Sequence, residues 1–139
     1  MAASTVWRIC IWLALSAGPA GAGEMWITNE KDHTVSVIDT KTQELKASYN
    51  VGLRPRGIIF AKDFSELYVR ASDDDRIDVL DPETGVVIRS MPSGEDPEQF
   101  ALHPNNRYLY IANEEDAMAT VLDVTSDEVL AEINVGIEP

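Results

Sequence analysis

The chain has 139 residues, of which 45% are hydrophobic and 25% charged, a composition typical of folded globular proteins that excludes a disordered chain. Its 24 acidic residues outnumber its 11 basic residues, which gives a net charge of −13. Because nucleic-acid binding relies on Lys and Arg to contact phosphate, this balance argues against a nucleic-acid partner.

Residues 1–22 have the layout of a secretory signal. Arg8 supplies one positive charge, residues 9–17 are almost all apolar, and a small-residue Ala-x-Ala site ends at Ala22. We therefore predict cleavage after Ala22 and a periplasmic or secreted protein. The apolar run is much shorter than the roughly 20 residues of a membrane span, so we expect no anchor. Cys10 is the only cysteine and would leave with the signal.

The rest of the chain repeats with a period of 42 residues, as the numbers of the matching residues show. The aligned positions are Trp26, Tyr68 and Tyr110; Asp39, Asp81 and Asp123; Gly52, Gly94 and Gly136; and Pro55, Pro97 and Pro139. A fixed period of this size predicts one supersecondary unit copied along the chain.

The first copy, residues 24–52, is incomplete. It is predicted to contain three strands, at 26–29, 34–38 and 44–51, with no strand before them. Gln43 stands where the second copy has a turn glycine, so we expect it to have a strained positive φ.

The second copy, residues 57–94, has the clearest pattern. The predicted strands are 57–61, 66–71, 76–80 and 86–91. In the third of these, Ile77 and Val79 alternate with Asp78, which is the period of a half-buried strand. The turn Asp81–Gly85 combines an Asp that can cap backbone N–H groups, a proline of fixed φ and a glycine suited to positive φ.

The third copy, residues 99–136, follows the same plan, with strands at 99–103, 108–113, 119–123 and 129–135. Asp127 occupies the position of Gly85 and is also expected to have a positive φ. Four-stranded units of roughly 40 residues are typical of propeller blades. We therefore predict an all-β fold: a partial β-propeller of four-stranded antiparallel blades, with three, four and four strands.

Short motifs within the repeats resemble those of YVTN β-propeller proteins. The matching segments are Tyr68-Val69-Arg70-Ala71, Tyr110-Ile111-Ala112-Asn113, 35–39 and 51–55. Residues 26–32, 54–57 and 96–104 more narrowly resemble the opening blades of periplasmic β-propeller proteins associated with pyrroloquinoline quinone (PQQ)-dependent catabolism. The resemblance implies propeller repeats over residues 23–139 and an N-terminal portion of a protein about twice as long. It also implies a non-catalytic binding or scaffold role beside PQQ-dependent alcohol oxidation.

Strand direction predicts where a ligand or partner would bind. Because successive strands of a blade are antiparallel, every second loop lies at the same edge, so the acidic loops share an edge with the Gly-x-x-Pro links between blades. The candidate ligand-binding residues at this edge are Arg54, Arg56, Asp73, Asp74, Asp75, Asp96, Glu98, Glu114 and Glu115. Arg56 and Glu98 directly follow the prolines and are predicted to border the central channel. This edge could bind a protein partner, a cationic group, a metal or a small ligand; alternatively, its charges belong to solvated turns.

The sequence offers no catalytic or cofactor motif. His33 and His103 are predicted at opposite edges, which does not meet a metal-ligand spacing, and Cys-x-x-Cys-His is missing. We therefore predict no enzyme, no cofactor and no metal site. The alternative is a fragment of an enzymatic propeller, lactonase-like or d1-haem-like, which needs histidines or carboxylates converging in the channel. Three blades also leave two end faces, which further blades or a second copy would have to cover.

Overall fold

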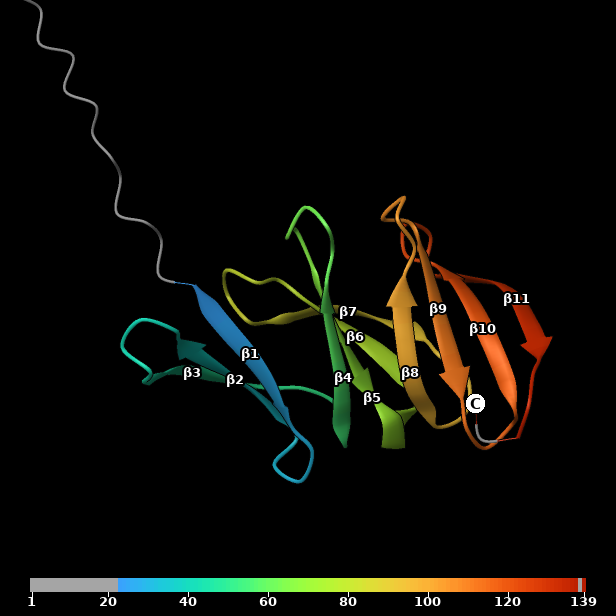
Figure 1. The fold of residues 1–139 in the computed structure, drawn as a ribbon, viewed down its shortest axis with the longest axis horizontal. Coiled ribbons are helices and arrows are strands. Elements are labelled where there is room, and N and C mark those ends of the chain that lie inside the picture. The colour runs from blue at the N-terminus through green and yellow to red at the C-terminus, as the bar shows by residue number, and fades with distance from the viewer. Residues whose placement is uncertain (1–22, 138) are drawn as a thin grey trace, which may run out of the picture.

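The computed structural model describes residues 23–137 and 139, and the predicted signal, residues 1–22, lies outside this part. Eleven strands form three antiparallel sheets, set side by side like neighbouring blades (Figure 1). The prediction of an all-β, partial β-propeller fold with three, four and four strands is confirmed. No helix in the described part is long and apolar enough to cross a membrane.

Each sheet is one blade, and its strands lie in chain order. Blade 1 contains β1 (Glu24–Asn29), β2 (Thr34–Asp39) and β3 (Leu45–Asn50). Blade 2 contains β4 (Pro55–Phe60), β5 (Leu67–Ala71), β6 (Arg76–Leu80) and β7 (Val87–Pro92). Blade 3 contains β8 (Pro97–Leu102), β9 (Tyr108–Asn113), β10 (Met118–Asp123) and β11 (Glu128–Asn134). A single 3-10 turn, Ser72–Asp74, joins β5 to β6.

The inner strands bring the blades together. In Figure 1, β4 of blade 2 lies between β1 of blade 1 and β8 of blade 3, and it contacts both. Both β4 and β8 begin two residues earlier than predicted. The reason is that Pro55 and Pro97 already pair with Ala71 and Asn113 before a local irregularity in the ladder.

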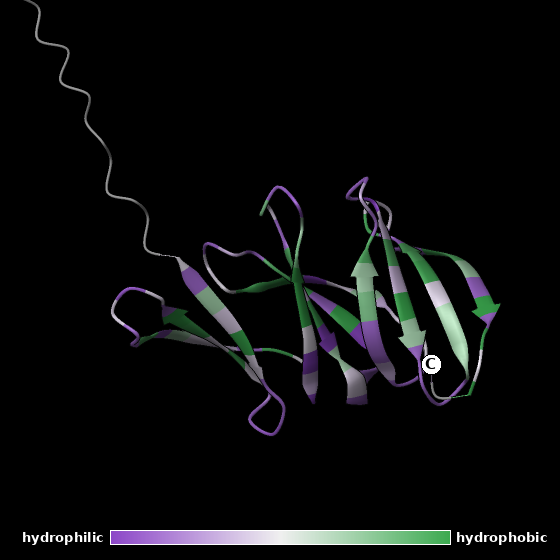
Figure 2. Ribbon diagram, viewed as in Figure 1, coloured by the Kyte–Doolittle hydropathy of each residue, from purple (hydrophilic) through white to green (hydrophobic). Residues whose placement is uncertain are grey.

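Blade 2 is packed on both faces. Its Tyr68, Ile77 and Met91 lie in a buried cluster with Leu109 and Ile111 of blade 3. On the opposite face, a second cluster joins Val35 of blade 1 to Leu67, Val69 and Leu80. Because side chains alternate between the faces of a strand, β5 is buried along its whole length. Figure 2 shows the hydrophobic residues mainly on the strands and the hydrophilic residues mainly on the connecting loops.

The turns between the last two strands of each blade follow the predicted chemistry. The Asp81 carboxylate accepts a hydrogen bond from the backbone N–H of Glu83 (2.8 Å). Gly85 has a φ of +69°, and Gln43 and Asp127 adopt the same left-handed conformation at +61° and +58°. The expectation of positive φ at these two non-glycine residues is therefore confirmed.

Candidate functional site

The links between blades and the loops joining second to third strands lie together at one edge, which we call the crossover edge. Arg54, in the link between blades 1 and 2, shows this arrangement. Its guanidinium donates hydrogen bonds to Glu30 of blade 1 (3.1 Å) and to Asp73 of blade 2 (3.3 Å), and it lies 3.9 Å from Asp96 before blade 3. These bonds raise the pKa of Arg54, and its guanidinium lowers the pKa of Glu30. One arginine thus connects all three blades.

Two other candidate residues brace the backbone of the links. The Asp74 carboxylate accepts a hydrogen bond from the backbone N–H of Leu53 (2.8 Å). The Asp75 carboxylate accepts one from the backbone N–H of Asp96 (3.0 Å), and Asp75 itself has a φ of +51°. Both carboxylates therefore have a structural task, whatever else they bind.

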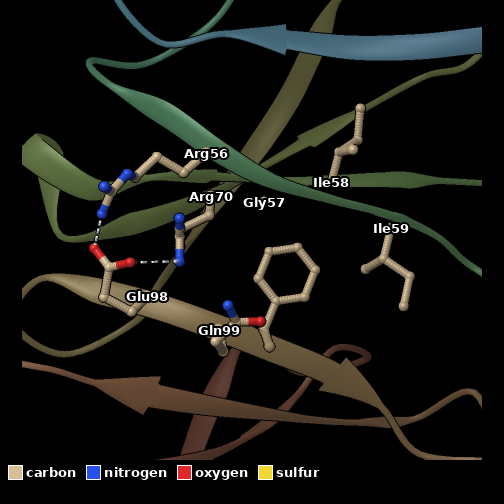
Figure 3. Close-up of a pocket in the computed structure, with 8 residues that line it drawn as sticks. Arg56, Gly57, Ile58, Ile59, Arg70, Glu98 and Gln99 are labelled. Atoms are coloured by element: carbon tan, nitrogen blue, oxygen red, sulfur yellow. Dashed lines mark hydrogen bonds and ion pairs between the residues drawn. The ribbon is translucent and has the colours of Figure 1, made fainter. Parts of the chain in front are cut away.

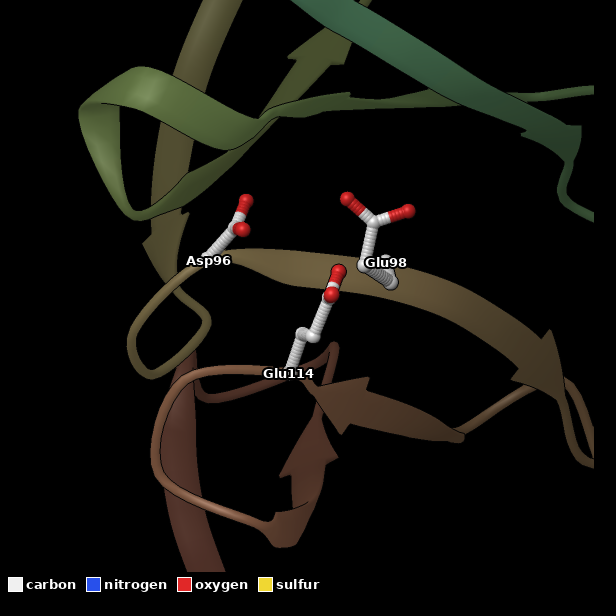
Figure 4. A group of neighbouring side chains, drawn as sticks. All are labelled: Asp96, Glu98 and Glu114. Atoms are coloured by element: carbon white, nitrogen blue, oxygen red, sulfur yellow. The ribbon is translucent and has the colours of Figure 1, made fainter. Parts of the chain in front are cut away.

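Three carboxylates gather at the blade 3 end of the crossover edge (Figure 4). Oxygen atoms of Asp96, Glu98 and Glu114 lie within 4.8 Å of one another. Such a group could surround a cation, but exposed acidic clusters commonly hold none, and two of these three already lie beside arginines. Glu115 is not one of these three; it lines a hollow of about 270 Å³ together with Arg54 and Asp96.

A cavity of about 370 Å³ lies between the inner strands β4 and β8 (Figure 3). Its lining residues are Arg56, Gly57, Ile58, Ile59, Arg70, Glu98, Gln99 and Phe100. A Cβ at Gly57 would stand 2.9 Å from the Phe100 ring, so a glycine is what allows the two strands to lie this close. The volume of the cavity falls at the lower end of the range for small-molecule pockets, roughly 300–1,000 Å³.

The polar wall of the cavity consists of two arginines and one glutamate. Arg56 donates a hydrogen bond to one Glu98 oxygen, and Arg70 Nη1 lies 3.9 Å from the other. The Arg70 side chain is only 3% exposed, and its Nε and Nη1 have no hydrogen-bond acceptor among the described residues. Burial lowers the pKa of Arg70, against the opposing effect of the Glu98 charge. A buried donor without an acceptor is costly, which marks Arg70 as unusual.

The sequence predicted part of this cavity. Arg56 and Glu98 were expected at the channel, and the structure brings them into contact. Arg70 and Gln99 were not expected as site residues. The signal for Arg70 was in the repeat itself, because the aligned residues, Thr28 and Ala112, are small.

The histidines lie at opposite edges, as expected. His33 accepts a hydrogen bond from the backbone N–H of Arg54 (3.0 Å) at the crossover edge. His103 accepts one from the backbone N–H of Asn105 (3.2 Å) in the turn after β8. Both rings thus brace local backbone.

Comparison with known proteins identifies a fold and not a family. No protein-family model matches the chain, and no curated protein sequence is similar to it. Among solved structures it is similar to hydrazine synthase of Kuenenia stuttgartiensis, with a TM-score of 0.77 and 23% identity over 84% of this chain. It is also similar to the dihydro-heme d1 dehydrogenase NirN in complex with DHE, with a TM-score of 0.68 and 18% identity over 81% of this chain. The chain spans 34% and 24% of those two chains, and at this level of identity the likeness shows a shared β-propeller fold alone.

Proposed function

We propose that this chain is a binding module of a β-propeller and that its ligand site is the cavity between β4 and β8. The observation that carries this proposal is the position of the cavity. It opens beside the crossover edge, where links and loops from three blades meet on a rigid frame, and such loops commonly hold the binding residues of a fold. Guanidinium, carboxylate and amide groups line it beside apolar walls, an arrangement suited to orienting a small ligand.

The proposed role is binding and not catalysis. The described lining contains no hydroxyl, thiol or imidazole that could act as a nucleophile or as a proton carrier near neutral pH. Two of the three charged residues there, Arg56 and Glu98, already pair with each other across blades 2 and 3.

Export belongs to the same proposal. The layout of residues 1–22 supports secretion to the periplasm. The resemblance of 26–32, 54–57 and 96–104 to periplasmic propellers associated with PQQ-dependent catabolism supports a role beside PQQ-dependent alcohol oxidation. N-terminal sequencing of protein recovered from the periplasm is expected to begin at Gly23. Soluble cytoplasmic protein that still carries residues 1–22 would contradict export.

Three monosubstituted benzenes of similar size and different charge test the cavity. Benzoate, benzamide and benzylamine are offered singly to the full chain, and binding is followed by ligand-observed NMR. We expect at least one to bind, and Gln99→Trp to weaken that binding by about tenfold or more, because an indole at this exposed lining position fills the space.

The matched control for that test is Asn50→Trp. Asn50 is also a neutral, exposed residue near the crossover edge, but it lies outside the cavity lining. Its tryptophan variant is expected to bind the probes as the wild type does. Equal binding by the wild type and Gln99→Trp, or no binding of any probe at millimolar concentration, would overturn the proposed site.

The alternative is an enzymatic propeller to which this chain contributes some blades. What favours it is that the two similar structures carry the names of enzymes, a synthase and a dehydrogenase. The coding sequence downstream of Pro139 distinguishes the two. Further repeats that place histidines at the position of Arg56 favour an enzyme, and repeats without them favour a binding module.

A further inference from the structure

Arg70 departs from the repeat in which it lies. The equivalent residue in blade 1 is Thr28, whose hydroxyl donates a hydrogen bond to the backbone carbonyl of Arg56 (3.1 Å) and so joins blade 1 to blade 2. In blade 3 it is Ala112. A small side chain is therefore sufficient at the equivalent position between blades 1 and 2, and the guanidinium of Arg70 is an addition to the repeat.

The charge of Arg70 is incompletely balanced within the cavity. The lining contains two guanidinium groups and one carboxylate, and the additional carboxylate of Glu30 stands beside Arg56 and not beside Arg70. Glu98 is hydrogen-bonded to Arg56 and stands 3.9 Å from Arg70, beyond hydrogen-bond distance. Arg56 also has Glu30 at 3.7 Å. Arg70 is consequently the arginine of the cavity whose Nε and Nη1 donors have no acceptor among residues 23–137 and 139.

We propose that the cavity binds a small organic carboxylate, with the carboxylate on Arg70 and the apolar body against Ile59 and Phe100. The inference rests on the proposed binding function and names its ligand class. Arginine is the side chain best suited to a carboxylate, because its fork of N–H groups matches the two oxygens.

The apolar wall distinguishes this ligand from a simple inorganic anion. Ile59 of β4 and Phe100 of β8 form this wall (Figure 3), whereas the Ile58 side chain lies on the other side of β4, against the cluster that joins blades 1 and 2. A ligand with a hydrophobic part gains free energy by covering this surface, whereas inorganic phosphate does not. Gln99 adds an amide that can donate to or accept from a second polar group of the ligand.

Glu98 competes with such a ligand for the positive charge of Arg70. Its carboxylate is the anion nearest to Arg70 and repels a second carboxylate placed there. Removing the charge of Glu98 while keeping its shape should therefore strengthen binding, and removing the charge of Arg70 should weaken it. A purely structural ion pair would give no change in ligand affinity with either substitution.

The experiment titrates benzoate, benzamide, benzylamine and inorganic phosphate into the full chain and three variants, with affinity measured by ligand-observed NMR. In the wild type we expect benzoate to bind at least about tenfold tighter than benzamide, because charge-assisted hydrogen bonds exceed neutral ones. Arg70→Met should weaken benzoate by about tenfold or more, and Glu98→Gln should tighten it by about threefold. Lys41→Met removes an exposed positive charge outside the cavity and should leave affinity unchanged.

The outcomes separate this inference from the proposed function. If benzamide, benzylamine or phosphate binds as tightly as benzoate or more tightly, the assignment to the carboxylate class is overturned. Loss of that probe's binding in Gln99→Trp would still support the cavity as a binding site. Unchanged benzoate affinity in Arg70→Met, with a native circular dichroism spectrum, would also overturn it. If Arg70→Met does not fold, Glu98→Gln decides, since weaker benzoate binding in that variant contradicts the proposal.

Discussion

Arg89 is the side chain that joins blades 2 and 3 at the edge opposite the crossover edge. It donates two hydrogen bonds to Glu66, one to Asp127 (3.1 Å) and one to the backbone carbonyl of Val124 (3.0 Å). The hydrogen bond from Arg89 lowers the pKa of Glu66, and the bond to Glu66 raises the pKa of Arg89. A two-pronged contact of this kind is among the stronger ion pairs of protein surfaces.

The Glu66 pair predicts a pH dependence of stability. Because the folded-state pKa of Glu66 lies below its ordinary value of 4.5, the pair contributes fully above that value, and the contribution is lost as the pH falls through the folded pKa. We expect Glu66→Gln to lower the free energy of unfolding by about 1 kcal/mol at pH 7, and this difference to disappear toward pH 2. Urea unfolding at several pH values measures it.

Glu44→Gln is the control for that measurement, since Glu44 is exposed and no side-chain partner is recorded for it among the described residues. It should not differ from the wild type at any pH. A Glu66→Gln difference that stays constant from pH 7 to pH 2 would show that the ion pair is not its source.

Single residues were the hardest part of the molecule to predict from the sequence. Asp78 read as the polar member of an alternating strand, but it is buried and accepts hydrogen bonds from Gly52, Arg76 and Ser90. Its role depends on a partner 26 residues away, and nothing local to the sequence reveals such a contact. For Arg70, the repeat shows that the residue departs from its small equivalents, but its position beside Glu98 of the next blade is known only from the structure.

At the scale of elements, the repeat made the strands and their order predictable. Alternating apolar residues specify which strands exist, and the spacing of 42 residues carries that pattern from one blade to the next. The starts of β4 and β8 were less predictable. Proline usually signals the end of pairing, but Pro55 and Pro97 are the first residues of their strands and pair with Ala71 and Asn113.

The turn between β2 and β3 offers a stabilising substitution. Gln43 has a φ of +61° and is exposed, whereas the equivalent residue of blade 2 is Gly85. A non-glycine residue in the left-handed region carries strain, so we expect Gln43→Gly to raise the free energy of unfolding by about 1 kcal/mol. Thermal melts of the wild type and the variant test this expectation.

Gln43→Ala separates backbone strain from loss of the side chain in that turn. Alanine removes the amide but keeps the Cβ that causes the strain, so its melting temperature should not rise. A rise of equal size in Gln43→Ala and Gln43→Gly would contradict the strain explanation.

At the scale of the whole molecule, the two end faces differ from the interfaces inside. Tyr68 is 1% exposed where blade 3 covers it, whereas the equivalent Tyr110 of blade 3 is 43% exposed. Toward the other end, Val69 is 0% exposed and its blade 1 equivalent, Ile27, is 38% exposed. The same positions that form the core of blade 2 thus lie open at both ends of the arc.

These open faces predict that the chain associates in solution. Burying apolar surface contributes about 25 cal/mol per Å², so covering a blade face of a few hundred Å² is worth several kcal/mol. We expect light scattering on the purified chain to show dimers or larger species at micromolar concentration. Replacing Tyr110 and Ile133 together by lysine, on the open face of blade 3, should increase the monomer fraction.

The control replaces two exposed loop residues, Thr42 and Asn105, by lysine. This control adds equal charge away from the open face of blade 3 and should leave association unchanged. A wild-type chain that stays monomeric up to high concentration, with a cooperative melt, would show that the end faces need no cover.

The pairing of Arg56 with Glu98 gives the arc a direction. These two residues hold the same position in successive repeats, 42 residues apart, yet they carry opposite charges. A blade 2 placed next to another blade 2 would bring arginine against arginine, and two copies of blade 3 would oppose two glutamates. The contact therefore stabilises one order of blades, and charge repulsion destabilises an arrangement shifted by one repeat. The repeats are similar in sequence, but the charge at this position differs between them. It therefore favours packing of blade 2 against blade 3 and disfavours packing of either blade against a copy of itself.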